Sequence, residues 1–165
     1  MNKNIILTSR DIDNKVLRIS YQICETFHNE NEIVIAGISK NGFVLAKRIQ
    51  QKLIEISTLK TIICEVIIDK SNPLNPIKTS LKSNEYQDKN LVLIDDVLNS
   101  GSTLIYGVKH FLDVPLKKFK TAVLVDRNHK RFPVKADFKG ISLSTSSKEH
   151  VEVVFTENES YAHLI

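Results

Sequence analysis

The stretch of sequence that decides the fold is Leu91–Thr103, LVLIDDVLNSGST. It opens with four consecutive apolar residues, a run typical of a strand buried on both faces of a parallel sheet. The pattern predicts that this strand is followed by a loop over Asp95–Ser102 and a helix over Thr103–Leu112. In open α/β sheets, ligands bind at the carboxyl ends of the strands. The acidic pair Asp95-Asp96 therefore marks a candidate site.

The segments around this stretch alternate between helical and strand patterns. Apolar residues recur at helical spacing over Thr8–Phe27, where Thr8 and Asp11 resemble a capping box, and over about Phe43–Ile56. Short apolar runs predict further strands at 33–38, 61–68, 121–125, 141–143 and 151–155. This alternation predicts an α/β protein with a mainly parallel sheet.

A long polar stretch, residues 69–90, interrupts the alternation. It contains Pro73 and Pro76 and shows little periodicity. A loop of this length inside a compact domain is either disordered or functional, often as a lid over an active site. The sequence leaves both alternatives open.

Length and composition indicate one globular domain over residues 1–165. The chain is 42% hydrophobic and 25% charged, and no apolar run is long enough to span a bilayer. No segment has the pattern of a secretory signal, so we expect a cytoplasmic protein with no membrane partner. Cys24 and Cys64 lie in apolar-periodic stretches, which predicts reduced, buried thiols. The net charge of +4 fits an anionic ligand and also permits nucleic acid.

The residue types in the central stretch suit a phosphate beside a polyol. Backbone N–H groups of a tight loop and a helix N-terminus bind phosphate oxygens, and Gly101 permits close approach. Asp95 and Asp96 would accept hydrogen bonds from sugar hydroxyls or stabilise a developing positive charge, as at an oxocarbenium-like ribose carbon. The alternative is structural: the acidic pair ends a strand, and Ser100 or Ser102 caps a helix.

The central stretch resembles the phosphoribosyl pyrophosphate motif of type I phosphoribosyltransferases. Further similarity, at Gly37-Ile38, at 123–129 and at 136–140, points to the bifunctional pyrimidine-operon attenuation regulator and uracil phosphoribosyltransferase branch of that family. The resemblance implies a three-layer α/β/α sandwich with a central, mainly parallel sheet plus a small β-rich hood, in which 69–90 is a flexible hood loop. It also implies a homodimer or higher homo-oligomer.

The resemblance implies an enzyme that transfers 5-phosphoribose from phosphoribosyl pyrophosphate to a nucleobase, with uracil favoured, and releases pyrophosphate. Asp95 and Asp96 would be catalytic and hold the ribose hydroxyls. Mg²⁺ would be held by the substrate and not by the protein alone. The remaining implied positions are Asn99, Ser100, Gly101, Ser102 and Thr103 for the 5′-phosphate, Ser39, Lys40, Asn41 and Gly42 for the pyrophosphate, and Asp126 and Arg127 on the base side.

Two departures from the family pattern bear on the acceptor and on affinity. Asn99 stands where enzymes for 6-oxopurines carry an acidic residue, and those enzymes also have a lysine near Asp126, so a purine acceptor is disfavoured. Ser102 stands where the regulators usually carry arginine, which predicts weaker phosphate binding.

The resemblance also implies an alternative: a nucleotide-sensing regulatory protein that binds the RNA of pyrimidine genes. His129, Lys130 and Arg131 are the candidate RNA-binding residues, because phosphate contacts require clustered cations. The same residues would also fit an exposed, solvated turn.

Overall fold

A computed structural model of the chain describes residues 3–165 and has a six-stranded sheet at its centre. The strand order is β4-β3-β2-β5-β6-β7, parallel except for the β3–β4 pair. The strands are β2 (Glu32–Ile38), β3 (Lys60–Ile67), β4 (Lys78–Thr79), β5 (Asn90–Leu98), β6 (Lys118–Asp126) and β7 (Phe138–Ser142). The predicted mainly parallel sheet is confirmed.

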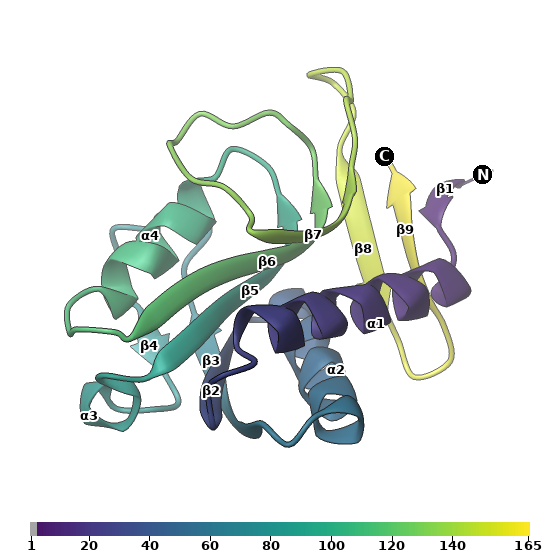
Figure 1. Cartoon of the computed structure of the whole chain (residues 1–165). Coiled ribbons are helices and arrows are strands. Elements are labelled where there is room, and N and C mark those ends of the chain that lie inside the picture. Colours follow the sequence, from purple (N-terminus) through teal and green to yellow (C-terminus); the bar gives the residue numbers. More distant parts are fainter. Residues whose placement is uncertain (1–2) are drawn as a thin grey trace.

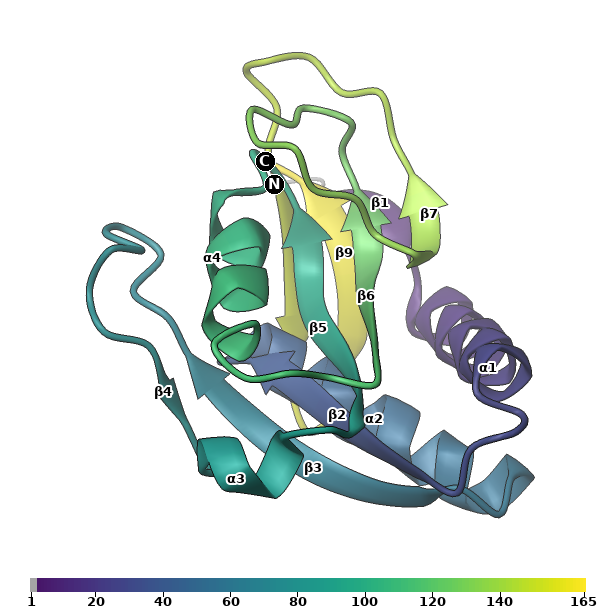
Figure 2. The ribbon, with the colours of Figure 1, turned by 60° about the vertical axis from the view of Figure 1, so that its left-hand side comes forward.

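Helices cover both faces of this sheet. The helices are α1 (Ser9–Thr26), α2 (Asn41–Ile56), α3 (Ser83–Tyr86) and α4 (Ser102–Phe111). Figure 2 shows α4 on one side of the sheet, with α1 and α2 on the other. Each face carries its own apolar core, and all residues of β5 are buried. The expected three-layer α/β/α sandwich is therefore confirmed. Within residues 3–165, no helix combines the length and apolar character that a bilayer crossing requires.

A second, three-stranded antiparallel sheet joins the two ends of the chain. Its order is β1 (Asn4–Leu7), β9 (Ser160–Leu164) and β8 (Val151–Phe155). Figure 1 shows these strands beside the end of α1. Only β8 was predicted; β1 has four residues, and β9 mixes polar with apolar side chains, so neither produces a clear pattern. This sheet provides the expected small β-rich part.

The first helix begins as the sequence predicts. The Thr8 hydroxyl accepts from the Asp11 N–H, and the Asp11 carboxylate accepts from the Thr8 N–H, which completes the capping box. Ile12 and Val16 are among the helix residues that face the core. Cys64 is buried and Cys24 half-buried, and both thiols are free.

Two boundaries differ from the expectation. Residues 69–90 are not one continuous loop, because they contain β4 and α3. The Tyr86 ring in α3 packs edge-on against the Phe111 ring, with 5.0 Å between the ring centroids. Likewise, the acidic pair does not lie in a loop: β5 continues to Leu98, since Val97 and Leu98 are apolar and keep their pairing with β6.

Gly37 in β2 allows α2 to pack directly on the sheet. A Cβ at this position would lie 2.6 Å from both Ala46 Cβ and Phe43 Cα, and 2.7 Å from Gly42 O. Two of these three atoms belong to the backbone and cannot move aside without displacing the helix. The glycine therefore sets the distance between α2 and the strand that it covers.

We expect Gly37→Ala to lower the free energy of unfolding by about 1–3 kcal/mol, because overpacking at this contact must displace α2. Urea denaturation would measure the change. Gly107→Ala in α4 is the matched control, because the nearest atom is the end of the Leu93 side chain at 2.9 Å, and alanine favours the helix. An equal or smaller loss at Gly37 than at Gly107 would contradict this account.

Candidate functional site

The site lies where β5 extends beyond its pairing with β2. Pairing with β2 ends at Gly37–Ile94, whereas pairing with β6 continues to Leu98–Asp126. Beyond Ile94, one edge of β5 is therefore free of strand partners. Asp95 and Asp96 occupy this part of the strand and are only 3% and 9% exposed.

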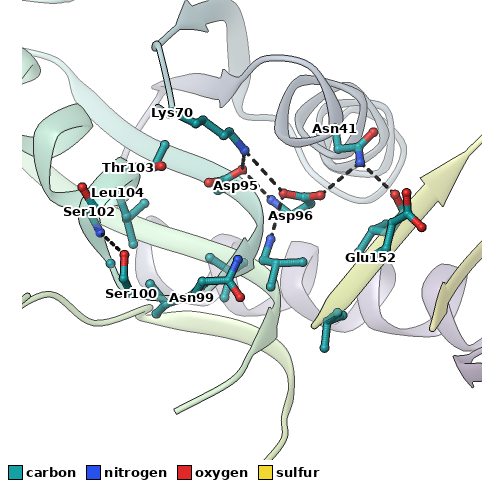
Figure 3. Close-up of a pocket in the computed structure, with 16 residues that line it drawn as sticks. Asn41, Lys70, Asp95, Asp96, Asn99, Ser100, Ser102, Thr103, Leu104 and Glu152 are labelled. Carbon is teal, nitrogen blue, oxygen red and sulfur yellow. Dashed lines mark hydrogen bonds and ion pairs between the residues drawn. The ribbon is translucent and has the colours of Figure 1, made fainter. Parts of the chain in front are cut away.

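The two carboxylates are held by a small set of donors (Figure 3). Asp95 Oδ1 accepts from the Asp96 N–H at 2.9 Å, and Asp96 Oδ1 accepts from the Val97 N–H at 2.9 Å. Lys70 Nζ lies 3.4 Å from Asp95 Oδ1 and 4.0 Å from Asp96 Oδ1. Asn41 donates to Asp96 Oδ2 at 3.1 Å and to Val153 O at 2.8 Å. The acidic pair thus connects three separate segments of the chain.

Burial makes the ionised form of this pair costly. Desolvation, and then the charge of Asp96, raise the pKa of Asp95 to about 8, against the opposing effect of Lys70. A buried pair of adjacent carboxyls with a perturbed pKa, lying in a cleft, is typical of a functional site.

The loop after β5 has the form of an anion site. Gly101 has a φ of 86°, in the left-handed region, and a Cβ there would lie 2.7 Å from Val134 Cγ1. The Ser102 N–H donates to Ser100 Oγ at 3.2 Å, and α4 starts at Ser102. The N-terminus of α4 and the hydroxyls of the loop can therefore bind a phosphate.

One cavity of about 230 Å³ brings the acidic pair and this loop together. It is lined by both aspartates, by all of residues 97–104, by Asn41 and Lys70, and by Val123 and Val151–Val153. All seven residues predicted for phosphoribosyl pyrophosphate binding lie on its wall.

The predicted pyrophosphate turn contributes only in part. Asn41 lines the cavity, and Gly42 packs so closely that a Cβ would lie 2.8 Å from Ile94 O. Ser39 Oγ instead donates to Glu65 Oε1 at 2.8 Å, and Lys40 is exposed outside the cavity wall.

The predicted base-side residues lie behind the cavity and do not line it. Asp126 accepts from the Asn128 N–H at 2.9 Å and pairs with Lys139 at 3.4 Å. Arg127 is buried and donates to Asn99 Oδ1 at 2.9 Å. Instead, the start of β8 lines the cavity together with the acidic pair.

The three candidate RNA-binding residues differ in their exposure to solvent. Lys130 and Arg131 are exposed, whereas the His129 ring contacts Thr145 O and is half-buried. The Arg131 backbone N–H donates to Ser100 O at 2.7 Å, so this turn packs on the phosphate loop.

Sequence reasoning missed Lys70 and the start of β8 as parts of the site. Lys70 lies three residues after the end of β3, where parallel strands deliver ligand-binding residues, and this position was the available signal. Val151–Val153 carried no such signal, because their place depends on the second sheet.

Comparisons with known proteins agree with this geometry. Residues 3–159 match the phosphoribosyl transferase domain. The bifunctional protein PyrR of Fusobacterium nucleatum is 35% identical over 161 residues, covering 93% of this chain and 91% of that protein. The PyrR of Streptococcus agalactiae is 30% identical over 164 residues, covering 98% and 95%. A crystal structure of a hypoxanthine-guanine phosphoribosyltransferase from Bacillus anthracis has a TM-score of 0.78 at 20% identity, covering 99% and 97%. The last likeness concerns the fold.

We expect Asp95→Asn to stabilise the protein at neutral pH. The pKa is about 3.9 in an unfolded chain and about 8 in the fold, so the native state loses stability as the pH rises from about 4 to 8. The carboxamide removes this cost, and at pH 7 the free energy of unfolding should rise by about 1–3 kcal/mol. Urea denaturation between pH 4 and 8 should show the gain shrinking as the pH falls.

Asp69→Asn serves as the control of opposite sign. Asp69 is exposed, and hydrogen bonds from Ser71, then from the Asn72 N–H, lower its pKa. Its ionised form is favoured by the fold, so this variant should gain no stability at pH 7. A parent-like pH profile in Asp95→Asn would contradict the account of the buried pair.

Proposed function

This chain belongs to the phosphoribosyltransferase family, and on that basis we propose that it transfers 5-phosphoribose from phosphoribosyl pyrophosphate to uracil and releases pyrophosphate. The observation that carries the proposal is the placement of Asp95 and Asp96 beside the anion-binding loop in one cavity. A phosphorylated sugar needs both features, an acceptor of hydroxyl hydrogen bonds and a phosphate cradle.

Each part of the cosubstrate has a counterpart in the cavity. The 5′-phosphate fits the loop 99–103, where the N-terminus of α4 and the serine and threonine hydroxyls supply donors. The ribose hydroxyls fit the acidic pair as donors. The pyrophosphate fits the side of Asn41 and Lys70, where a half-exposed ammonium is available.

The acidic pair also suits the chemistry of the transfer. The bond from ribose C1′ to the pyrophosphate oxygen breaks, and its electron pair leaves on pyrophosphate. A bond from C1′ to a base nitrogen forms as that nitrogen gives up its proton, for which the released pyrophosphate is an acceptor. The ribose becomes electron-poor between the two events. Its positive charge favours the ionised form of the acidic pair, and the fixed carboxylates stabilise that charge in turn. The apolar side chains of Val151 and Val153 in β8 help to exclude water from this centre.

Magnesium belongs to this proposal as a substrate-bound ion. Among residues 3–165, no group of three or more His, Cys, Asp or Glu side chains could hold a metal. The carboxylates of Asp95 and Asp96 are oxygen donors of the kind that Mg²⁺ prefers, and this ion usually keeps several waters and substrate oxygens. Bound to pyrophosphate, it would neutralise charge on the leaving group.

Uracil is favoured over a purine by the residues near the base side. Asn99 carries a carboxamide and no acidic group. Lys139, which pairs with the Asp126 carboxylate, does not line the cavity. The curated relatives named PyrR also favour a pyrimidine, whereas the hypoxanthine-guanine enzymes share less sequence with this chain.

We expect nucleotide formation from uracil when the protein is incubated with phosphoribosyl pyrophosphate, Mg²⁺ and a panel of bases. The double variant Asp95→Asn with Asp96→Asn should lose at least about 100-fold in kcat while remaining folded, because it removes the charge facing C1′. Asp113→Asn, exposed and outside the cavity, is the matched control. Saturable binding without product from any base would rule out the transfer reaction.

A regulatory function that includes RNA binding is the second candidate. Lys130 and Arg131 are adjacent and exposed, and the Arg131 backbone N–H bonds to Ser100 O in the phosphate loop, so a ligand in the cavity could alter how these cations are presented. Clustered, exposed cations are the groups that contact RNA phosphates.

If this second function exists, Lys130→Glu with Arg131→Glu should weaken binding to a pyrimidine-gene leader RNA. A plot of the logarithm of the association constant against the logarithm of the salt concentration should become less steep by about 1–2, since its steepness increases with the number of phosphates that the protein neutralises. Lys78→Glu with Lys82→Glu makes an equal change of charge around β4, away from the cavity, and should have little effect. Equal effects of the two double variants would refute a specific RNA-binding turn.

A further inference from the structure

Arg127 is a buried cation that joins two segments on either side of the cavity. It follows β6 directly and is 5% exposed. Its NH1 atom donates to Asn99 Oδ1 at 2.9 Å, and its Nε donates to Thr145 Oγ1 at 3.1 Å. Its NH2 atom donates to Ser146 O at 3.4 Å and also contacts Glu149 O. One planar guanidinium thus connects the phosphate loop to the loop that precedes β8.

The second of these loops leads into the part of β8 that lines the cavity. Residues 143–150 connect β7 to β8, and the first three residues of β8 line the cavity opposite the phosphate loop. Both ends of the loop are also held by backbone hydrogen bonds: the Leu143 N–H donates to Asp126 O at 2.8 Å, and His150 exchanges two bonds with Ile165. Residues 146–150, which lead into β8, are exposed, and Arg127 NH1 also lies 3.5 Å from His150 Nδ1. The hydrogen bonds of Arg127 are therefore the side-chain restraint on residues 145–149, just ahead of the backbone pairing that holds β8.

The charge of Arg127 is not neutralised by a partner at contact distance. Among residues 3–165, no carboxylate oxygen lies within 4.0 Å of its guanidinium nitrogens, although its field contributes to lowering the pKa of Glu149 after the hydrogen bonds from Ser146. A buried cation bonded mainly to neutral oxygens is costly unless an anion is near. The adjacent phosphate loop is where that anion would lie.

Asn99 links Arg127 to the cavity through a hydrogen bond. Its carboxamide oxygen accepts from Arg127, so its amide nitrogen, which can only donate, is left for an anion in the loop. Asn99 is exposed and lines the cavity, whereas Arg127 does not line it. Asn99 is therefore the residue through which the Arg127 side chain contacts the cavity wall.

We propose that Arg127 is a positioning residue that couples the 5′-phosphate loop to the base side of the cavity. A phosphate in the loop fixes Asn99, which fixes the guanidinium, which in turn holds residues 145–149 and orders the start of β8. Binding of phosphoribosyl pyrophosphate then prepares the acceptor site, and by reciprocity the base tightens the cosubstrate. This coupling rests on the proposed function, because it requires a phosphate ligand in the loop.

Amide hydrogen exchange tests the coupling without turnover. The full chain is measured with and without phosphoribosyl pyrophosphate and Mg²⁺, no base being added, after calorimetry has established the concentration that saturates each variant. In the parent protein, the ligand should slow exchange at 99–103 and, by about fivefold or more, at 145–152. In Arg127→Gln, the protection at 99–103 should remain, whereas that at 145–152 should fall below about twofold.

Two further variants isolate the link. Asn99→Ala removes the carboxamide that bonds to Arg127 and leaves the buried arginine in place. This variant should also lose the protection at 145–152, so the test stands even if Arg127→Gln does not fold. Lys148→Met changes an exposed charge in the same loop and should keep the protection of the parent. A purely structural arginine would change exchange equally with and without the ligand.

The outcomes separate the two proposals. If phosphoribosyl pyrophosphate binds the parent protein but does not slow exchange at 145–152, or if that slowing persists in Asn99→Ala, the coupling is wrong and the proposed function stands. If phosphoribosyl pyrophosphate does not bind the parent protein at all, the proposed function fails, and the coupling fails with it.

Discussion

The burial of two adjacent carboxylates at the end of β5 is the constraint on which the rest of the site depends. Removing such groups from water costs several kcal/mol each, and the cost is offset only by well-placed donors. Here the donors are backbone N–H groups of β5, the amide of Asn41 and the ammonium of Lys70. Each comes from a different part of the fold, so the acidic pair determines how the turn after β2 and the segment after β3 must approach.

The close packing of α2 serves the same constraint. A Cβ on Gly42 would lie 3.1 Å from Asp95 Oδ1, so the glycine brings the first turn of the helix against the carboxylate. A helix N-terminus carries a partial positive charge, which favours an anion at that position. Gly37, one strand away, permits the same approach by leaving room for Gly42 and Phe43. Fold and electrostatics thus depend on the same two small residues.

The sequence was most informative where one continuous segment carries the whole feature. The motif Leu91–Thr103 predicted a sheet strand, an acidic pair and an anion loop, because neighbouring residues form all three. The capping box at Thr8 was predicted for the same reason. The predicted end of the strand at Ile94 was wrong, since β5 continues to Leu98 through pairing with β6, which no local pattern reports. The contacts of Lys70 and Arg127 join distant segments: Lys70 was missed although its place after β3 was a signal, and Arg127 was predicted on the base side without these contacts.

The division of the cavity explains why the phosphate side could be predicted and the base side could not. The loop and the acidic pair belong to β5 and α4, within the central sheet. The opposite wall is β8, whose position depends on pairing with β9 and on the hydrogen bonds of Arg127. Under the proposed function, the acceptor base would meet a strand placed by the second sheet. Its selection would then depend on how firmly β8 is held as well as on side chains at its surface, and Arg127 is the residue that makes this hold sensitive to the phosphate.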